Sequence, residues 1–468
     1  MPEVRGTLRQ GMALRLAESE AVTDSRLMPN HRFPQWFAER SAAHDHAVRR
    51  VPFATLKGWR FEPGTGNLGH DSGRFFTVEG LRVRTDDPRH GSWRQPILNQ
   101  PEIGILGIVV REFEGVLHCL MQAKMEPGNI NLVQLSPTVQ ATRSNYTMVH
   151  GGRRPRHLEF FTGDRPVAVV ADSLQSEHGH YFLRKRNRNM IVEVMDGPPE
   201  HEDFCWLTVG QLLRLLHQDN LVNMDARTVL SCLALADPAP GQDRAVRLLN
   251  WMTEMRTRHE LVQTVVPLHD VPSWRRSADT VGRADGRGFS IVAVEVAAAS
   301  REVAGWSQPL LRVGARSLAA LAVRRGVDGE LLLLVHARQE PGLTDVVELG
   351  PTVQCVPDHE RGLPPEQATR YLDRVLAMPA ERVRCDVVHS EEGGRFDQAE
   401  TRYLVVEAPD GFDEPLPDDY RWAPLDEVTA LLRHSYCVNV QLRTLLLTLR
   451  NGLWPELHAD RDLHRRNS

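Results

Sequence analysis

An internal repeat is the feature that most constrains how this chain folds. The run WRQPIL at 93–98 returns as WSQPLL at 306–311, and LSPTVQ at 135–140 returns as LGPTVQ at 349–354. Further runs recur in the same order, at 126–128 and 340–342, 176–182 and 390–396, and 221–233 and 437–449. Because the matching segments keep their order and nearly their spacing, the sequence predicts two copies of one fold joined in tandem.

Each copy is predicted to combine strands with terminal helices. In the first copy, the apolar runs at 103–110 and 116–123 flank a short polar segment, which is typical of a hairpin, and 188–194 reads as a further strand. Leucines at helical spacing follow at 212–216, with counterparts at 428–432 in the second copy. We therefore expect an α+β protein made of two sandwiches and connecting helices.

The repeat and a Pro/Gly-containing break at 235–242 predict four parts of the chain. These are an N-terminal segment with a short helix at 1–58, a first module at 59–234, a connector with a helix at 235–272, and a second module with a C-terminal helix at 273–468.

Composition excludes several classes of protein. The 56 basic and 61 acidic residues give a formal charge of −5, so the chain lacks the cationic excess of a general nucleic-acid binder. No apolar run approaches the roughly 20 residues that span a bilayer, and the N-terminus lacks a secretory signal pattern, so we expect a cytoplasmic protein without membrane contact. Lysine occurs only at Lys57, Lys124 and Lys185, a skew typical of a high-GC bacterial genome that by itself says little about mechanism.

Motifs for metals and for nucleotide cofactors are missing. The six cysteines lie far apart, without a C-x-x-C pair or a Cys/His cluster, which favours buried free thiols and predicts no metal site. The sequence contains no G-x-x-x-x-G-K-[ST] loop, no G-x-G-x-x-G after a strand and no G-x-S-x-G elbow. Nucleoside-triphosphate and dinucleotide chemistry therefore lack support.

Polar residues gather where the two copies match. As a single strand, 134–142 would place five polar side chains on one face: Gln134, Ser136, Thr138, Gln140 and Thr142. Such a face suits a polyhydroxy or nucleobase ligand, although a solvated edge strand containing Pro137 would show the same pattern. The PTVQ run that both copies share favours the binding face.

Beyond this strand the copies differ, and the first is richer in groups that bind phosphate or move protons. Residues 141–161 carry cationic, hydroxyl, imidazole and carboxylate side chains, and they correspond to 355–375 in the second copy. Catalysis is therefore expected in the first copy. For any single His or Tyr, a satisfied hydrogen bond within the fold is the alternative interpretation.

These runs together resemble the NDP-hexose 2,3-dehydratases of deoxysugar biosynthesis. The resemblance covers about residues 30–450 and is carried by AKMEPGNINLVQLSPTVQATRSNY, DSLQSEHGHYFLRKRNRNMIVEV and the weaker second set WSQPLL, PGLTDVVELGPTVQC and SEEGGRF. It implies two tandem Nudix-like α/β/α sandwich modules in a homodimer, with nucleotide-sugar pockets in both modules. It also implies dTDP-4-keto-6-deoxy-D-glucose as substrate, on a route to the 2,6-dideoxysugars of antibiotics.

The hydrolase signature of Nudix enzymes is missing from both copies. That signature, G-x5-E-x7-R-E-U-x-E-E-x-G-U, supplies the glutamates that hold Mg²⁺, and Glu391-Glu392-Gly393 is only a fragment of it. We expect the sandwich to be kept without the hydrolase chemistry.

The implied reaction needs no cofactor. The C4 ketone acidifies the C3 proton, a base removes it, and hydroxide leaves from C2 of the resulting enolate to give a dTDP-3,4-diketo-2,6-dideoxyhexose. Within the first copy, the functional groups suggest His157 or Glu159 as the C3 base and Tyr146 as the acid. Gln175 or Asn189 would donate a hydrogen bond to the enolate oxygen.

Binding residues are expected in both copies. Arg143, Arg186 and Arg188 are candidates for the diphosphate. Trp93 and Trp306 are candidates for stacking on thymine, although core aromatics would look the same in sequence. The remaining candidates for substrate contacts are Gln95, Gln140, Asn145, Glu177, Asn189, Gln354 and Glu391. The second copy is expected either to bind a nucleotide sugar without turnover or to act as structural support.

Two other functions remain open at this point. The chain could be a non-catalytic nucleotide-sugar binding partner of a sugar ketoreductase, the NADPH-dependent enzyme expected downstream in the pathway. It could also be a hydrolase that releases dTMP and requires Mg²⁺.

Overall fold

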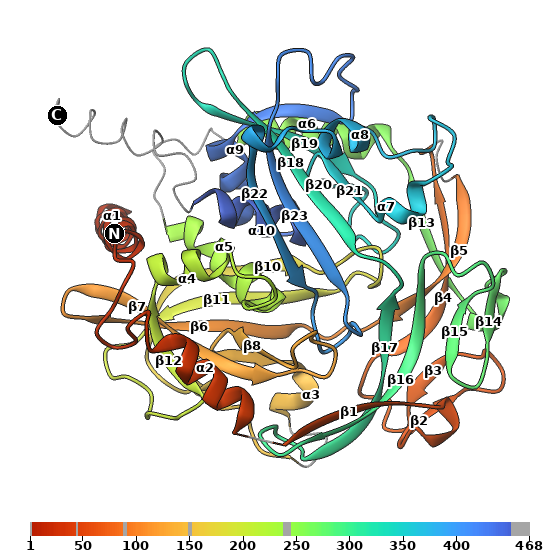
Figure 1. The fold of residues 1–468 in the computed structure, drawn as a ribbon, viewed down its shortest axis with the longest axis horizontal. Coiled ribbons are helices and arrows are strands. Elements are labelled where there is room, and N and C mark those ends of the chain that lie inside the picture. The colour runs from red at the N-terminus through yellow and green to blue at the C-terminus, as the bar shows by residue number, and fades with distance from the viewer. Residues whose placement is uncertain (1, 44, 88–90, 148–151, 237–244, 451–468) are drawn as a thin grey trace.

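The computed structural model describes residues 2–43, 45–87, 91–147, 152–236 and 245–450, and it has mixed α/β architecture (Figure 1). We call 2–236 the first half and 245–450 the second half. Most of the break predicted at 235–242 and the end of the chain beyond 450 lie outside the described residues.

The first half contains a seven-stranded sheet in the order β10-β11-β6-β7-β12, with β8 beside β7 and β9 beside β6. Strands β11 and β6 run parallel at its centre. The bounds are β6 Gly104–Phe113, β7 Val116–Met125, β8 Val133–Ser136, β9 Val139–Ala141, β10 Ala168–Ser176, β11 Arg186–Glu193 and β12 Phe204–Thr208.

The second half contains a sheet of the same size and strand order, β22-β23-β18-β19-β24, with β20 beside β19 and β21 beside β18. Its central pair, β18 and β23, is again parallel. The bounds are β18 Ser317–Arg325, β19 Leu331–Arg338, β20 Glu348–Gly350, β21 Val353–Cys355, β22 Val383–Ser390, β23 Glu400–Glu407 and β24 Tyr420–Pro424.

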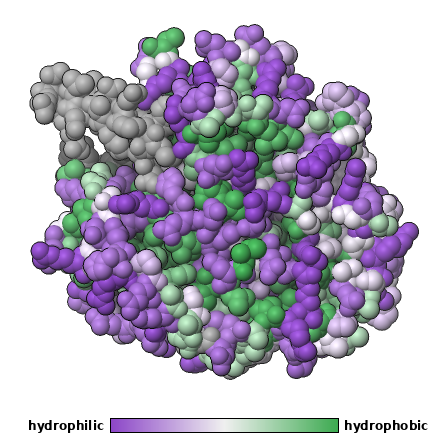
Figure 2. Space-filling view, viewed as in Figure 1, coloured by the Kyte–Doolittle hydropathy of each residue, from purple (hydrophilic) through white to green (hydrophobic). Residues whose placement is uncertain are grey.

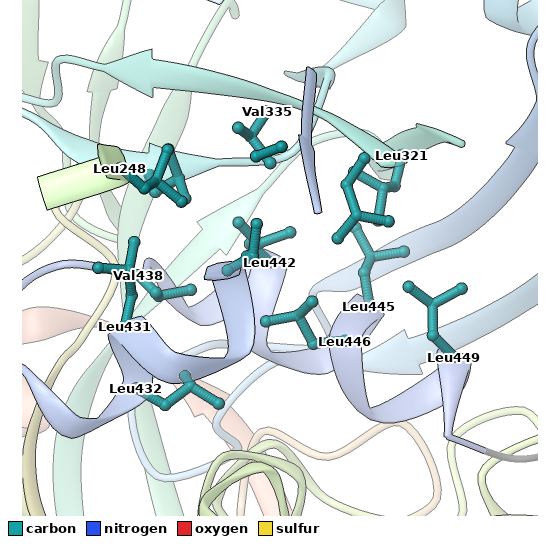
Figure 3. Packing of buried hydrophobic residues seen from close by; sticks show 14 of the residues in the cluster. Leu248, Leu321, Val335, Leu431, Leu432, Val438, Leu442, Leu445, Leu446 and Leu449 are labelled. Atoms are coloured by element: carbon teal, nitrogen blue, oxygen red, sulfur yellow. The ribbon is translucent and has the colours of Figure 1, made fainter. Parts of the chain in front are cut away.

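Helices and short helical turns cover both faces of each large sheet, and buried apolar side chains hold the layers together. The apolar run of β6 is buried on both faces of the sheet, which is why it shows no alternation. Figure 3 shows the second core, where Leu442 and Leu445 of α10 pack toward Leu321 and Val335 of the sheet. The helices are α1 Pro2–Ala21, α2 Phe33–Ala42, α3 Arg143–Tyr146, α4 Val209–Leu215, α5 Met224–Ser231, α6 Val246–Arg258, α7 Pro357–Glu360, α8 Leu372–Leu376, α9 Leu425–Ala430 and α10 Val440–Leu449.

Two smaller sheets join the halves by exchanging strands. Strand β1 of the first half pairs with β16 of the second, and β13 of the second half pairs with β4 of the first. One sheet has the order β1-β16-β15-β14 with β17 beside β16, and the other has β13-β4-β3-β2 with β5 beside β4. The bounds are β1 His46–Val51, β2 Trp59–Phe61, β3 Leu68–His70, β4 Thr77–Thr85, β5 Ser92–Asn99, β13 Leu261–Val266, β14 Trp274–Arg276, β15 Thr280–Arg283, β16 Phe289–Ala298 and β17 Gly305–Val313.

The repeated Glu-Pro-Gly segments mark where the halves touch most closely. The Gly128 N–H donates to the Gly393 carbonyl at 2.7 Å, and the Gly342 N–H donates to the Gly179 carbonyl at 2.6 Å. A Cβ on Gly128 would lie 1.5 Å from the Phe396 carbonyl oxygen, and one on Gly342 would lie 1.9 Å from the Phe182 carbonyl oxygen. Only glycine allows this approach.

Two fully buried arginines add a second reciprocal contact. Arg227 donates to the Ser390 carbonyl at 3.0 Å, and Arg443 donates to the Ser176 carbonyl at 2.7 Å. Each guanidinium also donates to a carbonyl of its own half, that of Val222 at 2.7 Å or of Val438 at 2.7 Å. The V-N-x-x-x-R-T segments that recur in the sequence therefore join the halves.

The polar run at 134–142 does not form the single strand predicted from its alternation. It divides at Pro137 into β8, which pairs with β7, and β9, which pairs with β6. Thr138 lies between them, accepts from the Val109 N–H at 2.9 Å and donates to the Leu120 carbonyl. The predicted common face was wrong because proline ends one ladder and the chain changes partner.

The surface in Figure 2 is mostly polar, with apolar side chains in the hollows between charged groups. Among the described residues, no helix has the length and apolar character needed to span a membrane.

Candidate functional site

A cavity of about 540 Å³ lies where the two halves meet. The first large sheet contributes the ends of β7, β9 and β11, and α5 contributes its first turn. Strand β17 and the segment between β22 and β23 close it from the second half, and the β2–β3 region supplies an aromatic end. Its polar and charged lining includes Lys57, Gln100, Lys124, Glu126, Gln140, Asn145, Lys185, Asn187, Asp225, Arg301, Glu302, Gln308, Glu392 and Arg395.

All three lysines of the chain line this one cavity, although the chain has 56 basic residues. Arginine stays charged in proteins, whereas a buried lysine can lose its proton. Two of the three, Lys124 and Lys185, are buried in this cavity.

Lys124 and Glu126 lie at the end of β7 and are almost fully buried. The Lys124 Nζ donates to the Gln140 carbonyl at 3.3 Å and lies 3.9 Å from Glu126 Oε1. Gln140 in turn donates from Nε2 to Glu126 Oε1 at 2.6 Å. Burial, followed by the positive charge of Arg301, lowers the pKa of Lys124, so the neutral amine becomes accessible.

Asp225 enters the cavity from the first turn of α5. Asn223 caps this helix by accepting from the Ala226 N–H at 2.8 Å, which fixes the direction in which the first turn starts. Asp225 is 2% exposed, and its Oδ1 has no hydrogen-bond partner among the described residues. Burial, then the charges of Glu392 and Glu177, raises the pKa of Asp225 well above its usual value, which favours a neutral carboxyl.

Lys185 and Asn187 form the opposite wall at the start of β11. The Lys185 Nζ donates to the Glu102 carbonyl at 2.7 Å, and burial lowers the pKa of Lys185. The Asn187 Nδ2 donates to Glu177 Oε1 at 2.6 Å. The other oxygen of Glu177 is buried without a partner among the described residues.

The second half supplies the remaining wall. Trp306 donates from Nε1 to Gln308 Oε1 at 2.7 Å, and Gln308 donates from Nε2 to the Gly394 carbonyl at 2.7 Å. These bonds tie β17 to the segment that carries Glu392 and Arg395. Burial raises the pKa of Glu392 to about 7, so this carboxyl can exchange a proton near neutrality.

The far end of the cavity is aromatic. Trp59 contacts His70 and Phe76, with ring centroids 5.3 Å and 4.8 Å away, and His70 lies 4.6 Å from Phe75. The Arg395 guanidinium lies over Phe76, 4.5 Å from the ring centre. An apolar wall beside cations is suited to a planar base that carries a diphosphate.

Four of the residues predicted from sequence line this cavity: Gln140, Thr142, Asn145 and Trp306. Glu177 reaches it indirectly, through the bond from Asn187 described above. The lining comes from both halves, whereas catalysis was predicted in the first copy.

The predicted acid and base candidates lie elsewhere. His157 is buried with its ring centroid 4.7 Å from that of Phe204, and burial lowers the pKa of His157 to about 4. Glu159 follows it in a short helical turn at Leu158–Phe160, and Tyr146 packs against the apolar cluster on the same face of the sheet. None of the three lines the cavity.

The predicted enolate donors and diphosphate ligands are also outside the lining. Gln175 donates from Nε2 to the Leu432 carbonyl at 3.0 Å, and Asn189 is buried in β11. Arg188 makes a bidentate pair with Asp172 at 2.8 and 2.6 Å. Arg143 is exposed, and Arg186 lies 6.0 Å from the ring centre of Tyr436.

The other predicted binding residues make hydrogen bonds or ion pairs within the protein. Trp93 donates to Gln95 Oε1 at 2.9 Å, and Gln95 donates to the His180 carbonyl at 2.8 Å. Gln354 donates to Glu340 Oε1 at 2.7 Å. Glu391 forms a buried ion pair with His178, whose Nε2 lies 2.9 Å from Glu391 Oε2.

Five charged residues of the lining were not predicted from the sequence, although each lies within or beside a run that recurs: Lys124, Lys185, Asp225, Glu392 and Arg395. The available signal was the scarcity of lysine. Lysine occurs at only three positions in the sequence, and all three line the cavity.

Replacing His178 by Gln is expected to destabilise the protein by about 3–5 kcal/mol, because Glu391 would remain buried and unpaired. Burial opposes the charged ring, but Glu391 outweighs it and raises the pKa of His178 above 6.5. Burial likewise opposes the carboxylate, but His178 lowers the pKa of Glu391 below 4.5. The stabilisation is therefore fully present between these two values, fades as pH rises through the raised histidine pKa, and fades as pH falls through the lowered glutamate pKa.

Thermal melting of both proteins at about pH 5.5 and about pH 9 tests this window. The difference in Tm should be larger at the lower of the two pH values. A double variant, His178→Gln with Glu391→Gln, should recover part of the loss, since no charge is left unpaired. An equal difference at both pH values would show that the pair is not ionised in the folded protein.

A metal centre has no basis in the described residues, where no group of three or more His, Cys, Asp or Glu side chains is arranged to hold an ion.

Among solved structures, a Nudix hydrolase from M. smegmatis is similar over 31% of this chain and 87% of its own, with 21% identity and a TM-score of 0.17. That likeness is too weak to carry an argument about the fold.

Similarity in sequence is much stronger. The chain is 49% identical over 438 residues to a dTDP-4-dehydro-6-deoxy-alpha-D-glucopyranose 2,3-dehydratase of Amycolatopsis orientalis, covering 92% of each protein. It is 44% identical over 463 residues to the enzyme of that name from Saccharopolyspora spinosa, covering 94% of this chain and 95% of the relative. It is 49% identical over 438 residues to that of Streptomyces violaceoruber, covering 89% and 96%.

The family model described as NDP-hexose 2,3-dehydratase matches residues 30–233 and 245–449, which together make up most of the chain. With a lysine-lined cavity between its halves and relatives of matching length, the chain belongs to the NDP-hexose 2,3-dehydratase family, whose members are hydro-lyases.

Proposed function

We propose that this protein removes water from C2 and C3 of dTDP-4-keto-6-deoxy-D-glucose, and that the cavity between the halves is its active site. The single observation that carries the site is the convergence of all three lysines on one cavity beside buried carboxyl groups. The substrate follows from the names of relatives that match nearly the whole chain. A non-catalytic binding protein has no need for amines and carboxyls poised to exchange protons.

The reaction is an elimination that uses the substrate's own ketone. When a base takes the C3 proton, the C–H electron pair forms the C3–C4 double bond and the C4 oxygen becomes an enolate. The carbonyl then reforms, the electron pair shifts to the C2–C3 bond, and the C2 hydroxyl leaves as water after gaining a proton. The enol at C3 becomes a ketone as C2 gains a proton, giving dTDP-3,4-diketo-2,6-dideoxyhexose.

Lys124 is assigned the removal of the C3 proton. Its amine is favoured by burial and by Arg301, and a neutral amine is a competent base. Lys185 is assigned the enolate oxygen, because its Nζ is held by the Glu102 carbonyl at 2.7 Å and the charge of Glu177 opposes the lowering of its pKa by burial. The predicted assignments to His157, Glu159, Tyr146 and Gln175 are not carried into this site, since these residues do not line the cavity.

The nucleotide base is placed against Trp306, in the wall supplied by the second half. Trp306 presents one ring face beside the Arg301 guanidinium, 5.6 Å from the ring centre, and it can stack on thymine. Three cationic side chains of the cavity lining are assigned to the diphosphate: Lys57, Arg301 and Arg395. Gln140 and Asn145 are assigned to sugar hydroxyls.

We also propose the origin of the fold, the oligomeric state, the location and the pathway that the family resemblance implies. The recurring runs and the equal strand orders of the two large sheets support a duplicated module, for which the Nudix-like sandwich is the proposed ancestor. A homodimer, a cytoplasmic location, a role in making antibiotic sugars and an NADPH-dependent ketoreductase as the next enzyme are proposed with it.

The test is incubation of the purified protein with dTDP-4-keto-6-deoxy-D-glucose in D2O. We expect loss of one water from the sugar and deuterium at C2 of the product, in the presence or absence of EDTA. Recovery of unlabelled, intact substrate would overturn the proposed function. Release of dTMP that EDTA abolishes would instead indicate the hydrolase.

A further inference from the structure

Glu392 is a buried carboxyl group that the second half brings to the cavity, opposite the residues of the first large sheet. It lies between β22 and β23, and the segment that carries it is held by the bond from Gln308 to the Gly394 carbonyl at 2.7 Å. The Gly128 N–H fixes the same segment through the Gly393 carbonyl at 2.7 Å. Glu392 is thus placed by contacts on both sides of the junction.

The internal repeat shows what is unusual about this position. At the 214-residue spacing, Glu392 corresponds to His178, and its neighbour Glu391 corresponds to Glu177. On one side of the junction, His178 of the first half forms an ion pair with Glu391 of the second at 2.9 Å. On the other side, Glu392 of the second half takes the place of the histidine. Its partner there, Glu177 of the first half, is also a carboxyl group.

The two sides hold their glutamates in the same way. Thr401 donates to Glu391 Oε1, and its counterpart Asn187 donates to Glu177 Oε1 at 2.6 Å. The remaining oxygen of Glu391 lies 2.9 Å from His178 Nε2, whereas the place of that histidine beside Glu177 is taken by Glu392. Exchange of histidine for glutamate therefore converts a neutralised pair into two acids near each other.

We propose that Glu392 is the general acid that protonates the C2 hydroxyl as it leaves, so that the second half supplies one catalytic group to the site. This inference rests on the proposed dehydratase function and deepens it.

The surroundings of Glu392 suit a proton donor. Its Oε1 lies 3.1 Å from where a Cβ of Gly394 would be, and Glu126 Oε1 lies 3.7 Å from the same point, so a second carboxyl is close. Burial raises the pKa of Glu392 to about 7, against the lowering effect of Arg395. Glu177 of β10–β11 and Glu126 after β7 raise it further, and Lys185 lowers it; Asp225 of α5 completes the groups that face this position.

The proton balance closes with two groups. Lys124 takes the C3 proton, and Glu392 gives its proton to the departing C2 oxygen, which becomes water. As the enol forms the C3 ketone, the C3 hydroxyl returns a proton to Glu392 and the Lys124 ammonium delivers one to C2. Both groups end as they began, and one water has been lost.

Replacing Glu392 by Gln separates the two proton transfers. We expect kcat for water loss to fall by about a hundredfold or more, because the amide cannot donate a carboxyl proton. The base is untouched, so substrate recovered from the Glu392→Gln protein in D2O should carry deuterium at C3. Glu381→Gln, the same change at an exposed residue of the second half, should keep wild-type turnover.

A wild-type measurement gives the same test without a variant. As pH rises through about 7, Glu392 loses its proton while Lys124 stays competent, so the ratio of C3 exchange to water loss should rise. The inference is overturned if Glu392→Gln keeps near-normal turnover, if it loses C3 exchange together with turnover, or if the wild-type ratio does not change with pH. These outcomes all require an active wild-type enzyme, and failure of the proposed function would appear earlier, as a wild-type protein that leaves the substrate unchanged.

Discussion

Replacing Lys124 by arginine is expected to lower kcat by roughly a thousandfold, within the range for loss of a general base, while the protein stays folded. Arginine keeps the positive charge and the long stem but does not give up its proton, so it cannot act as a base. Steady-state kinetics gives the loss in kcat, and circular dichroism with thermal melting checks the fold. In D2O, recovered substrate should also lack deuterium at C3.

Lys185→Arg is the matched comparison, because Lys185 is also buried in the cavity but is assigned a role as a cation. Arginine can still stabilise an enolate, so this variant should lose much less, about tenfold, and should keep C3 exchange. The Glu392→Gln protein is expected to exchange at C3 and the Lys124→Arg protein is not, so the two defects are distinguishable. Near-normal turnover by Lys124→Arg, or equal losses in both lysine variants, would remove Lys124 as the base.

The parts of the fold that sequence could predict are those encoded locally. Apolar runs predicted strands in both halves, and the two large sheets indeed have equal strand order. The alternating polar run at 134–142 did not predict the strands correctly, because alternation does not show which neighbouring strand each residue pairs with. Pro137 ends β8, and Thr138 then bonds to the backbone of β6 and β7.

Residues that recur in both copies proved to hold the scaffold. Thr352 repeats the role of Thr138, accepting from the Ala322 N–H at 2.8 Å and donating to the Leu334 carbonyl at 2.6 Å. In both halves, the indole N–H of the repeated tryptophan also donates to the glutamine two residues later. Residues that recur therefore include much of the hydrogen-bonded scaffold, and two of them, Gln140 and Trp306, also line the cavity.

The groups assigned to chemistry lie where the copies differ. At the 214-residue spacing, Lys124 corresponds to Arg338, Lys185 to Ala399 and Glu392 to His178. Glu392 meets the two lysines only because the segment between β22 and β23 packs against the first half, and no local pattern encodes that contact. His157 had the right functional group, but sequence could not tell which face of the sheet it would occupy.

Replacing Gly128 by alanine is expected to destabilise the protein by about 3 kcal/mol, the upper end of what overpacking usually costs. The added Cβ would lie 1.5 Å from the Phe396 carbonyl oxygen, an obstacle of backbone that cannot rotate away. Its counterpart Gly342→Ala would meet the Phe182 carbonyl oxygen at 1.9 Å and should cost a similar amount. Equilibrium denaturation measures both free energies of unfolding.

Gly314→Ala and Gly64→Ala are the controls, since a Cβ at either position meets no atom within 4 Å. They should change the free energy of unfolding by less than about 0.5 kcal/mol. Because Gly128 also positions the segment that carries Glu392, its variant should lose turnover even at temperatures where it stays folded. Gly342 fixes the opposite junction, beside the His178–Glu391 pair, so its variant should keep more activity at equal loss of stability. If both variants were as stable as the controls, the close approach of the two halves at these glycines would be wrong.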